Sequence, residues 1–225
     1  MLPFLSVSIF HAFFYKFVKK MMLLVSIKNE NDSYKEIIEY FGKFFPLNNE
    51  DINDIKKYFI YKRIQKNVLI EQKGKITNNL YFIASGFIHV YVEKMIDGID
   101  EIITTQINCP TRLITTFESF NSGNPSEEYL KTITEVGLLI ISKDNFLKLL
   151  NKDDRWRDAF KQIYEQGLSY NEQRSKDMLT LDAEKRYLKL MDTRPELINN
   201  VPVKILASFI GIKSQSLSRI RGKIK

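Results

Sequence analysis

Residues 203–221 read VKILASFIGIKSQSLSRIR and predict two short helices joined by a sharp turn. Gly211 supplies the backbone freedom needed to leave the first helix, and Ala207, four residues earlier, is small enough for the two helices to cross closely. Leu217 and Ile220 lie three residues apart and give the second helix a stripe to bury. The segment therefore predicts a helix-turn-helix close to the end of the chain.

The outward face of the second predicted helix carries polar and basic side chains, and Ser214 can cap the start of that helix. A helix-turn-helix places the beginning of its second helix in the major groove of DNA. Arg can bond guanine and Gln adenine there, while Lys suits phosphates. The same pattern also fits an αα-hairpin with a solvated basic face. We expect DNA contacts, with Arg219 as first candidate, from these side chains: Ser214, Gln215, Ser218, Arg219, Arg221, Lys204, Lys213 and Lys223.

Composition and charge are compatible with a globular protein that binds a polyanion. The chain has 225 residues, of which 44% are hydrophobic and 27% charged, a balance that supports one large or two small domains. Its formal net charge is +7, and no Asp or Glu occurs from residue 197 to the end. The positive charge is therefore concentrated where the helix-turn-helix is predicted.

The cysteine and histidine content argues against several classes of protein. The single cysteine, Cys109, allows no internal disulfide and cannot hold an iron–sulfur cluster, which usually takes four thiolates. His11 and His89 are too few for the usual catalytic metal set of about three ligands. No nucleophile–base constellation stands out either, so we expect no enzyme and no metal site. Because a single cysteine gives no indication of an oxidising compartment, we expect a cytoplasmic location.

The beginning of the chain is unusual. Residues 1–15 contain no Lys, Arg, Asp or Glu, and three lysines follow within residues 16–20. A secretory signal carries its positive charge before the apolar run, and a membrane span needs about twenty apolar residues. We interpret residues 1–30 as a leader or arm without stable membrane association; a membrane-surface anchor is the alternative.

Helices are predicted on both sides of the middle region. Residues 32–59 show helical spacing of apolar side chains. Ser33 is the candidate cap of a first helix, and Asn48 or Asn49 that of a second. Asp144 is the candidate cap of a further short helix beyond the middle region.

The middle region, residues 60–141, alternates short β-prone runs with glycine-containing turns. Evenly spaced short strands of this kind predict an antiparallel barrel, roll or sandwich. His89 stands alone among these runs, so we interpret it as a strand side chain and not as a ligand. The clearest runs are residues 67–71, 80–84, 87–92 and 101–107.

Residues 153–178 contain no Pro and predict a long helix with an apolar stripe. The stripe either packs on the chain's own barrel or forms a two-fold dimer seam. We favour the seam, mainly because of the resemblance described next. The stripe consists of Trp156, Phe160, Ile163, Tyr164, Leu168 and Tyr170.

The whole arrangement resembles the Crp/Fnr family of bacterial transcription regulators. Residues 74–92 (GKITNNLYFIASGFIHVYV) resemble the family's β-roll, and residues 202–223 (PVKILASFIGIKSQSLSRIRGK) are similar to the endings of Bacteroidetes-type members. The resemblance implies an α+β fold with three parts: a cupin-like, cyclic-nucleotide-binding-domain-like antiparallel β-roll over residues 31–150, a long dimerisation helix over 151–180, and a helix-turn-helix domain over 181–225. It also implies a homodimer on a roughly palindromic DNA site, with RNA polymerase as a further candidate partner.

The family's recognition helix can be matched position by position. The match assigns base-facing positions to Ser214, Gln215, Ser218 and Arg219. It assigns Arg221 to a phosphate or flanking contact.

The effector site departs from the family pattern. Cyclic-nucleotide-binding members carry a Gly-Glu pair followed by an Arg-Ser or Arg-Thr pair, whereas residues 114–131 read ITTFESFNSGNPSEEYLK and contain no Arg. Glu118 follows Phe117 instead of Gly, and Glu127 and Glu128 lie near the place where a phosphate would sit and would repel it. We therefore expect no response to cyclic AMP and no cofactor, while another small effector stays open.

One other function remains as an alternative to a DNA-binding homodimer, and a second one fails on its chemistry. One is a small-molecule sensor whose C-terminal domain contacts protein instead of DNA. The other, an enzyme on a cupin-like roll, lacks the residues for the usual metal set.

Overall fold

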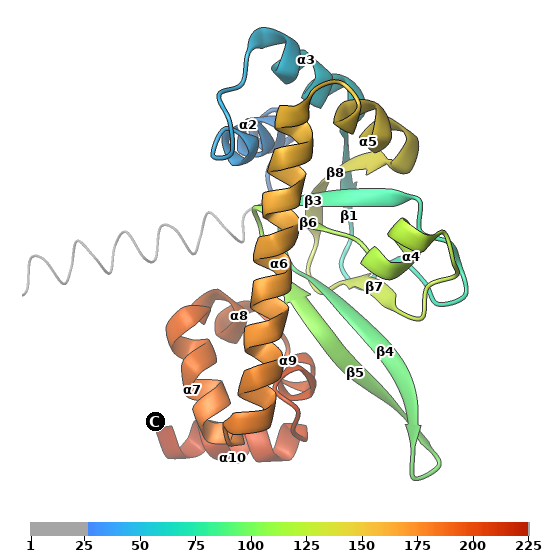
Figure 1. Cartoon of the computed structure of the whole chain (residues 1–225). Helices are drawn as coiled ribbons and strands as arrows, with labels where there is room; N and C mark the ends of the chain where they lie inside the picture. Colours follow the sequence, from blue (N-terminus) through green and yellow to red (C-terminus); the bar gives the residue numbers. More distant parts are fainter. Residues whose placement is uncertain (1–26, 225) are drawn as a thin grey trace, which may run out of the picture.

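The computed structural model describes residues 27–224, which fold into a β-roll, a long helix and a group of short C-terminal helices (Figure 1). The strands are β1 (Ile60–Ile64), β2 (Leu69–Glu71), β3 (Asn79–Ser85), β4 (Ile88–Ile96), β5 (Ile99–Asn108), β6 (Arg112–Ile114), β7 (Tyr129–Thr132) and β8 (Val136–Ser142). The helices are α2 (Glu30–Phe41), α3 (Asn49–Tyr58), α4 (Phe117–Ser122), α5 (Lys143–Leu150), α6 (Asp154–Thr180), α7 (Ala183–Thr193), α8 (Pro195–Asn200), α9 (Val203–Phe209) and α10 (Ser214–Ile224).

The strands form two four-stranded antiparallel sheets, in the orders β1-β8-β3-β6 and β2-β7-β4-β5. Alternate side chains of both sheets point inward and share one apolar cluster, to which β3 contributes Tyr81 and Ile83, and β4 contributes Ile88 and Val90. This arrangement confirms the predicted antiparallel roll, and each of the four predicted runs overlaps a strand.

Helices α2, α3 and α5 and the start of α6 share a second cluster with the outward side chains of β3 and β8, which includes Phe41, Phe82 and Trp156. The cap of α3 is Asn48, as predicted, in a capping box with Asp51. Two predicted caps are wrong. The caps of α2 and α5 are Asn29 and Ser142, whose side chains accept backbone N–H bonds.

The two mistaken caps have local structural reasons. Ser33 lies inside α2, where it is buried and donates to the carbonyl of Asn29. Asp144 lies in the first turn of α5, one position inside its first residue. Both helices therefore begin earlier than the apolar spacing alone indicated.

The long helix α6 begins after Asp153, whose side chain accepts a bond from the backbone N–H of Arg155, and it runs from the roll to the C-terminal helices (Figure 1). Its apolar stripe serves two purposes. Trp156 is fully buried against the roll and its helices, whereas Tyr164 and Leu168 are 53% and 57% exposed. Packing on the chain's own roll therefore explains only the first half of the predicted stripe.

Helices α7–α10 form a third cluster that also contains Phe87, Ile107 and Ile133 from the roll. The C-terminal helices thus share an apolar core with the roll. The predicted domain division at residue 181 stays a prediction. The predicted leader falls mostly on residues 1–26, which lie outside the described residues. Within residues 27–224, no helix combines the length and apolar character needed to cross a bilayer.

Candidate nucleic-acid interface

The turn between α9 and α10 has the geometry that the sequence predicts. Gly211 adopts a φ of +75°, in the left-handed region. Its N–H donates to the carbonyl of Ser208 at 3.1 Å, and the N–H of Ile212 donates to that of Ala207 at 2.9 Å. These two bonds form a Schellman motif, which ends α9 and sends the chain sharply into α10.

The inner face of α10 holds the helix on the rest of the domain. Leu217 is fully buried, and the half-buried Ile220 packs against the same cluster, which contains Leu206 and Ala207 of α9. The carbonyl of Lys213 accepts from the N–H groups of Ser216 and Leu217. Lys213 therefore occupies the N-cap position.

Ser214 is the first residue of α10, so the predicted cap is one position too late. Its side chain is half-buried, and its carbonyl accepts a bond from the Ser218 hydroxyl at 3.0 Å. Since Ser218 uses its only donor inside the helix, it keeps only acceptor capacity for a partner.

Most of the predicted DNA contacts lie on the open surface. Gln215 and Arg219, one turn apart, are both exposed on the outer face of α10. The three predicted phosphate-binding lysines, Lys204, Lys213 and Lys223, are exposed as well. The structure thus leaves a polar and basic outer face on the second helix of the motif.

Arg221 has a different position from the predicted one. Its Nε donates to the hydroxyl of Tyr187 at 3.1 Å, and its Nη2 donates to the carbonyl of Ile198 at 3.2 Å. The guanidinium also lies 5.7 Å from the centroid of the Tyr187 ring. These contacts fix α10 to α7 and α8, so Arg221 positions the helix, and its predicted DNA contact stays a prediction.

Two further features of the helix-turn-helix were not predicted from the sequence. Ser216 is exposed in the first turn of α10, where its short polar side chain can reach a partner. Its position two residues after Ser214 was a usable indication. In addition, the side chain of Ser208 bonds to β5: it accepts from the N–H of Thr104 at 2.8 Å and donates to the carbonyl of Ile102 at 2.9 Å. No local pattern indicates this contact, which joins residues more than 100 positions apart.

Two glutamates of the segment that differs from the family's cyclic-nucleotide site have partners within the roll. Glu127 pairs with Lys73 at 2.9 Å, and Glu128 accepts a bond from Thr105 at 3.3 Å. Burial raises the pKa of Glu128, and the neighbouring carboxylate of Glu118 raises it further. These carboxylates do not suit a phosphate. Among the described residues, no group of His, Cys, Asp and Glu could hold a metal ion.

The fold can be compared with solved structures. The regulator CLP of Xanthomonas campestris, described as responsive to c-di-GMP, superposes with a TM-score of 0.59 at 19% identity, over 79% of this chain and 91% of that chain. A transcriptional regulator of the crp/fnr family from Eubacterium rectale gives a TM-score of 0.61 at 13% identity, over 81% and 87%. FixK2 of Bradyrhizobium japonicum gives 0.60 at 14% identity, over 74% and 84%.

These likenesses confirm the resemblance to Crp/Fnr regulators at the level of the fold. No protein-family model matches the sequence, and no curated protein matches it either.

Proposed function

We propose that this chain is a sequence-specific DNA-binding transcription regulator that acts as a homodimer and does not respond to cyclic AMP. The observation that carries the proposal is the outer face of α10, where Gln215 and Arg219 are exposed on a helix held by a glycine turn. The likeness to regulators such as CLP supports the same function.

The side chains divide into two groups by chemistry. Arg219 and Gln215 can read base edges, since Arg pairs with guanine and Gln with adenine through two hydrogen bonds. Lys204, Lys213 and Lys223 suit phosphates, which position a protein on DNA without reading its sequence. Ser214 and Ser218 have a secondary role because of the bond between them.

The exposed side of α6 supports a dimer. Tyr164, Leu168 and Leu179 are 53%, 57% and 87% exposed. At about 100° per residue, the three side chains lie within roughly 60° of one another around the helix. Asn171 and Ser175 are exposed on the same side between them. A second copy of α6 would cover this stripe, and a polar residue in such a seam helps to fix its register.

Several finer parts of the function stay predictions. The carboxylates Glu118, Glu127 and Glu128 support independence from cyclic AMP because they would repel its phosphate. A cytoplasmic location and a contact with RNA polymerase rest only on the resemblance to the family and on the sequence.

A salt series on labelled DNA tests the proposal. Fluorescence anisotropy should show that affinity falls steeply with salt, and three lysines per protomer in a dimer correspond to a log–log slope of about −5. Lys223→Ala should reduce the magnitude of that slope by about 2 per dimer on every sequence. Arg219→Ala should cost about 1–3 kcal/mol per half-site and relax the base preference.

Lys161→Ala provides the matched control, because Lys161 is an exposed lysine of α6 away from the helix-turn-helix. It should leave both the slope and the preference unchanged. If the wild-type chain has no affinity for DNA even at low salt, the proposal fails and a sensor whose C-terminal helices contact protein becomes the better account.

A further inference from the structure

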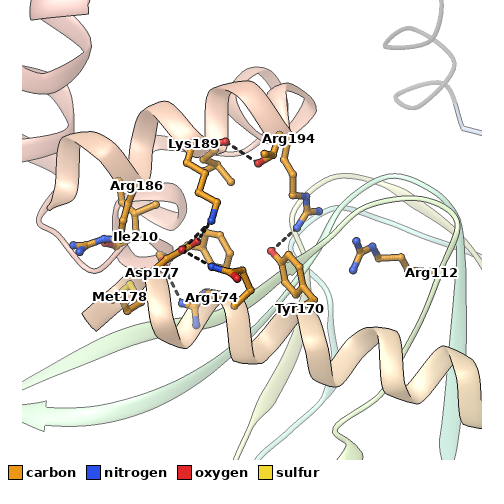
Figure 2. Close-up of a pocket in the computed structure, with 13 residues that line it drawn as sticks. Arg112, Tyr170, Arg174, Asp177, Met178, Arg186, Lys189, Arg194 and Ile210 are labelled. Carbon is orange, nitrogen blue, oxygen red and sulfur yellow. Dashed lines mark hydrogen bonds and ion pairs between the residues drawn. The ribbon is translucent and has the colours of Figure 1, made fainter. Parts of the chain in front are cut away.

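A cavity of about 360 Å³ lies at the junction of the roll, the long helix and the C-terminal helices (Figure 2). One wall comes from α6, with Tyr170 and Arg174, and Arg112 of β6 stands beside it. The opposite wall comes from the C-terminal helices, with Arg186 and Lys189 of α7. The cavity is therefore distinct from the roll interior and from the outer face of α10.

The lining of this cavity is strongly cationic. It contains four arginines and one lysine but a single acidic side chain, Asp177, which pairs with Lys189 at 2.6 Å. Arg194 pairs with Glu196 at 3.4 Å. Among the described residues, the other three arginines, Arg112, Arg174 and Arg186, form no ion pair with a carboxylate.

Arg112 is the most available of the three. Its guanidinium lies 5.2 Å from the centroid of the Tyr170 ring, and within residues 27–224 the side chain has no hydrogen-bond partner. Arg194 approaches the same ring at 5.7 Å and donates to the Tyr170 hydroxyl at 2.9 Å. Two guanidinium groups thus gather around one tyrosine at one end of the cavity.

Arg174 brings a second uncompensated charge. It donates to the carbonyl of Phe209 at 2.9 Å and stacks 4.5 Å from the centroid of the Phe209 ring. Its Nε is buried without a partner among the described residues, and burial lowers its pKa. A buried cation without a counter-ion is costly, and an anion nearby reduces that cost.

The lining also has an apolar part, which consists of Met178, Leu190, Phe209 and Ile210. Gln173 and Thr193 add uncharged polar groups. A ligand that fits would combine a charged group, bound by guanidinium donors, with an apolar body. Inorganic anions satisfy only the first of these requirements.

We propose that the cavity binds a small organic anion, a carboxylate or a phosphomonoester, whose charged group meets Arg112 and whose apolar part lies against Leu190 and Phe209. Arg194 already donates to Tyr170, to the carbonyl of Ile107 and to Glu196, so it contributes its positive charge nearby and not a direct bond. The roll around Glu127 and Glu128 carries carboxylates, so it suits a small anion less well than this arginine-lined junction does. Since the two walls belong to different parts of the fold, the bound anion would also stabilise the docking of the C-terminal helices.

Calorimetric titration of the full chain with phenyl phosphate tests this site without DNA, so its outcome is independent of the proposed function. Phenyl phosphate should saturate at one molecule per chain, and benzyl alcohol, which has a similar ring but no charge, should not bind measurably. A titration with benzoate shows whether a carboxylate is accepted as well as a phosphomonoester. Either anion supports the site.

Arg112→Ala and the milder Arg112→Gln should each weaken the binding at least about tenfold, because each removes a charge-assisted bond. Lys176→Ala is the matched control: Lys176 is exposed on α6 just outside the cavity, and its loss should change the affinity no more than about twofold. The proposal is overturned if neither anion binds more tightly than benzyl alcohol, or if folded Arg112→Gln binds as well as the wild type.

Discussion

Gly211 shows at the scale of one residue how the helix-turn-helix depends on backbone freedom. Its φ of +75° disfavours any side chain, and an added Cβ would also displace the flexible end of Met178, whose Cε it would meet at 2.5 Å. Gly211→Ala should therefore lower the free energy of unfolding by about 1–3 kcal/mol, measured by urea denaturation. Gly222→Ala is the matched control: it lies inside α10 with no atom within 4 Å of an added Cβ, and should be neutral or stabilise by up to about 1 kcal/mol. Equal effects of the two substitutions would contradict this account of the turn.

His89 links one residue to the pH dependence of stability. Burial and the nearby Lys131 lower its pKa from 6.5 to about 4. The unfolded state therefore binds a proton first as the pH falls, so the contribution is present above pH 6.5 and is lost as the pH falls towards about 4. The loss amounts to at most about 3 kcal/mol.

His89→Phe keeps an aromatic ring beside Tyr91, which stacks on His89 with a centroid distance of 4.9 Å. In urea denaturation at several pH values, this variant should lack the part of the stability loss between pH 6.5 and 4 that belongs to His89. If the difference between the two proteins stays constant over that range, the assignment of the low pKa is wrong.

Residues whose roles depend on near neighbours could be predicted from the sequence. The left-handed turn at Gly211 and the cap at Asn48 each involve contacts within a few positions. The contacts of Arg221 within the protein could not be predicted, because its partners Tyr187 and Ile198 are 34 and 23 positions away. A basic side chain on an outward-facing pattern can still fold back onto its own domain.

At the scale of elements, α6 combines two kinds of packing. Leu168→Glu places a charge in the exposed stripe that we propose as the dimer seam. It should convert a dimer into a monomer in sedimentation velocity, since a buried unpaired carboxylate is costly. Leu188→Glu is the matched control, because Leu188 is a 42% exposed leucine of α7 outside that stripe. A wild-type chain that sediments as a monomer at concentrations used for DNA binding would contradict the seam.

The types and order of the elements were predictable because each segment keeps one period along its length. Strand and helix spacing over residues 60–178 indicated the roll and the long helix. Which half of the α6 stripe the roll covers was not predictable, because the burial of Trp156 depends on α2 and its Phe41, more than 100 residues earlier. The sequence pattern shows that a face is apolar but not what covers it.

At the scale of the whole molecule, Ser208 connects the helix-turn-helix to the roll through its two bonds to β5. Ser208→Ala leaves the N–H of Thr104 without this partner and should lower the free energy of unfolding by about 1–3 kcal/mol. Hydrogen exchange at the Thr104 amide should become faster. Ser216→Ala, at an exposed serine of α10, should change neither quantity. Unchanged exchange at Thr104 would show that other contacts hold the two parts together.

The cationic cavity belongs to this scale, and sequence reasoning missed it for that reason. Arg112, Arg174 and Arg194 come from β6, α6 and the α7–α8 junction, and only the fold brings them together. The one local indication of the cavity in the sequence is the helical spacing of Tyr170, Arg174 and Asp177. Many solvated helix faces show the same spacing, so it did not identify a site.

The central claim, that the outer face of α10 reads DNA as part of a symmetric dimer, is tested most directly by selection of bound sequences from a random DNA pool. The account predicts an enriched palindromic consensus whose half-sites lie about one helical turn apart. The absence of any enriched sequence at low salt would contradict the account. So would a selection in which the Arg219→Ala variant enriches the same consensus as the wild type.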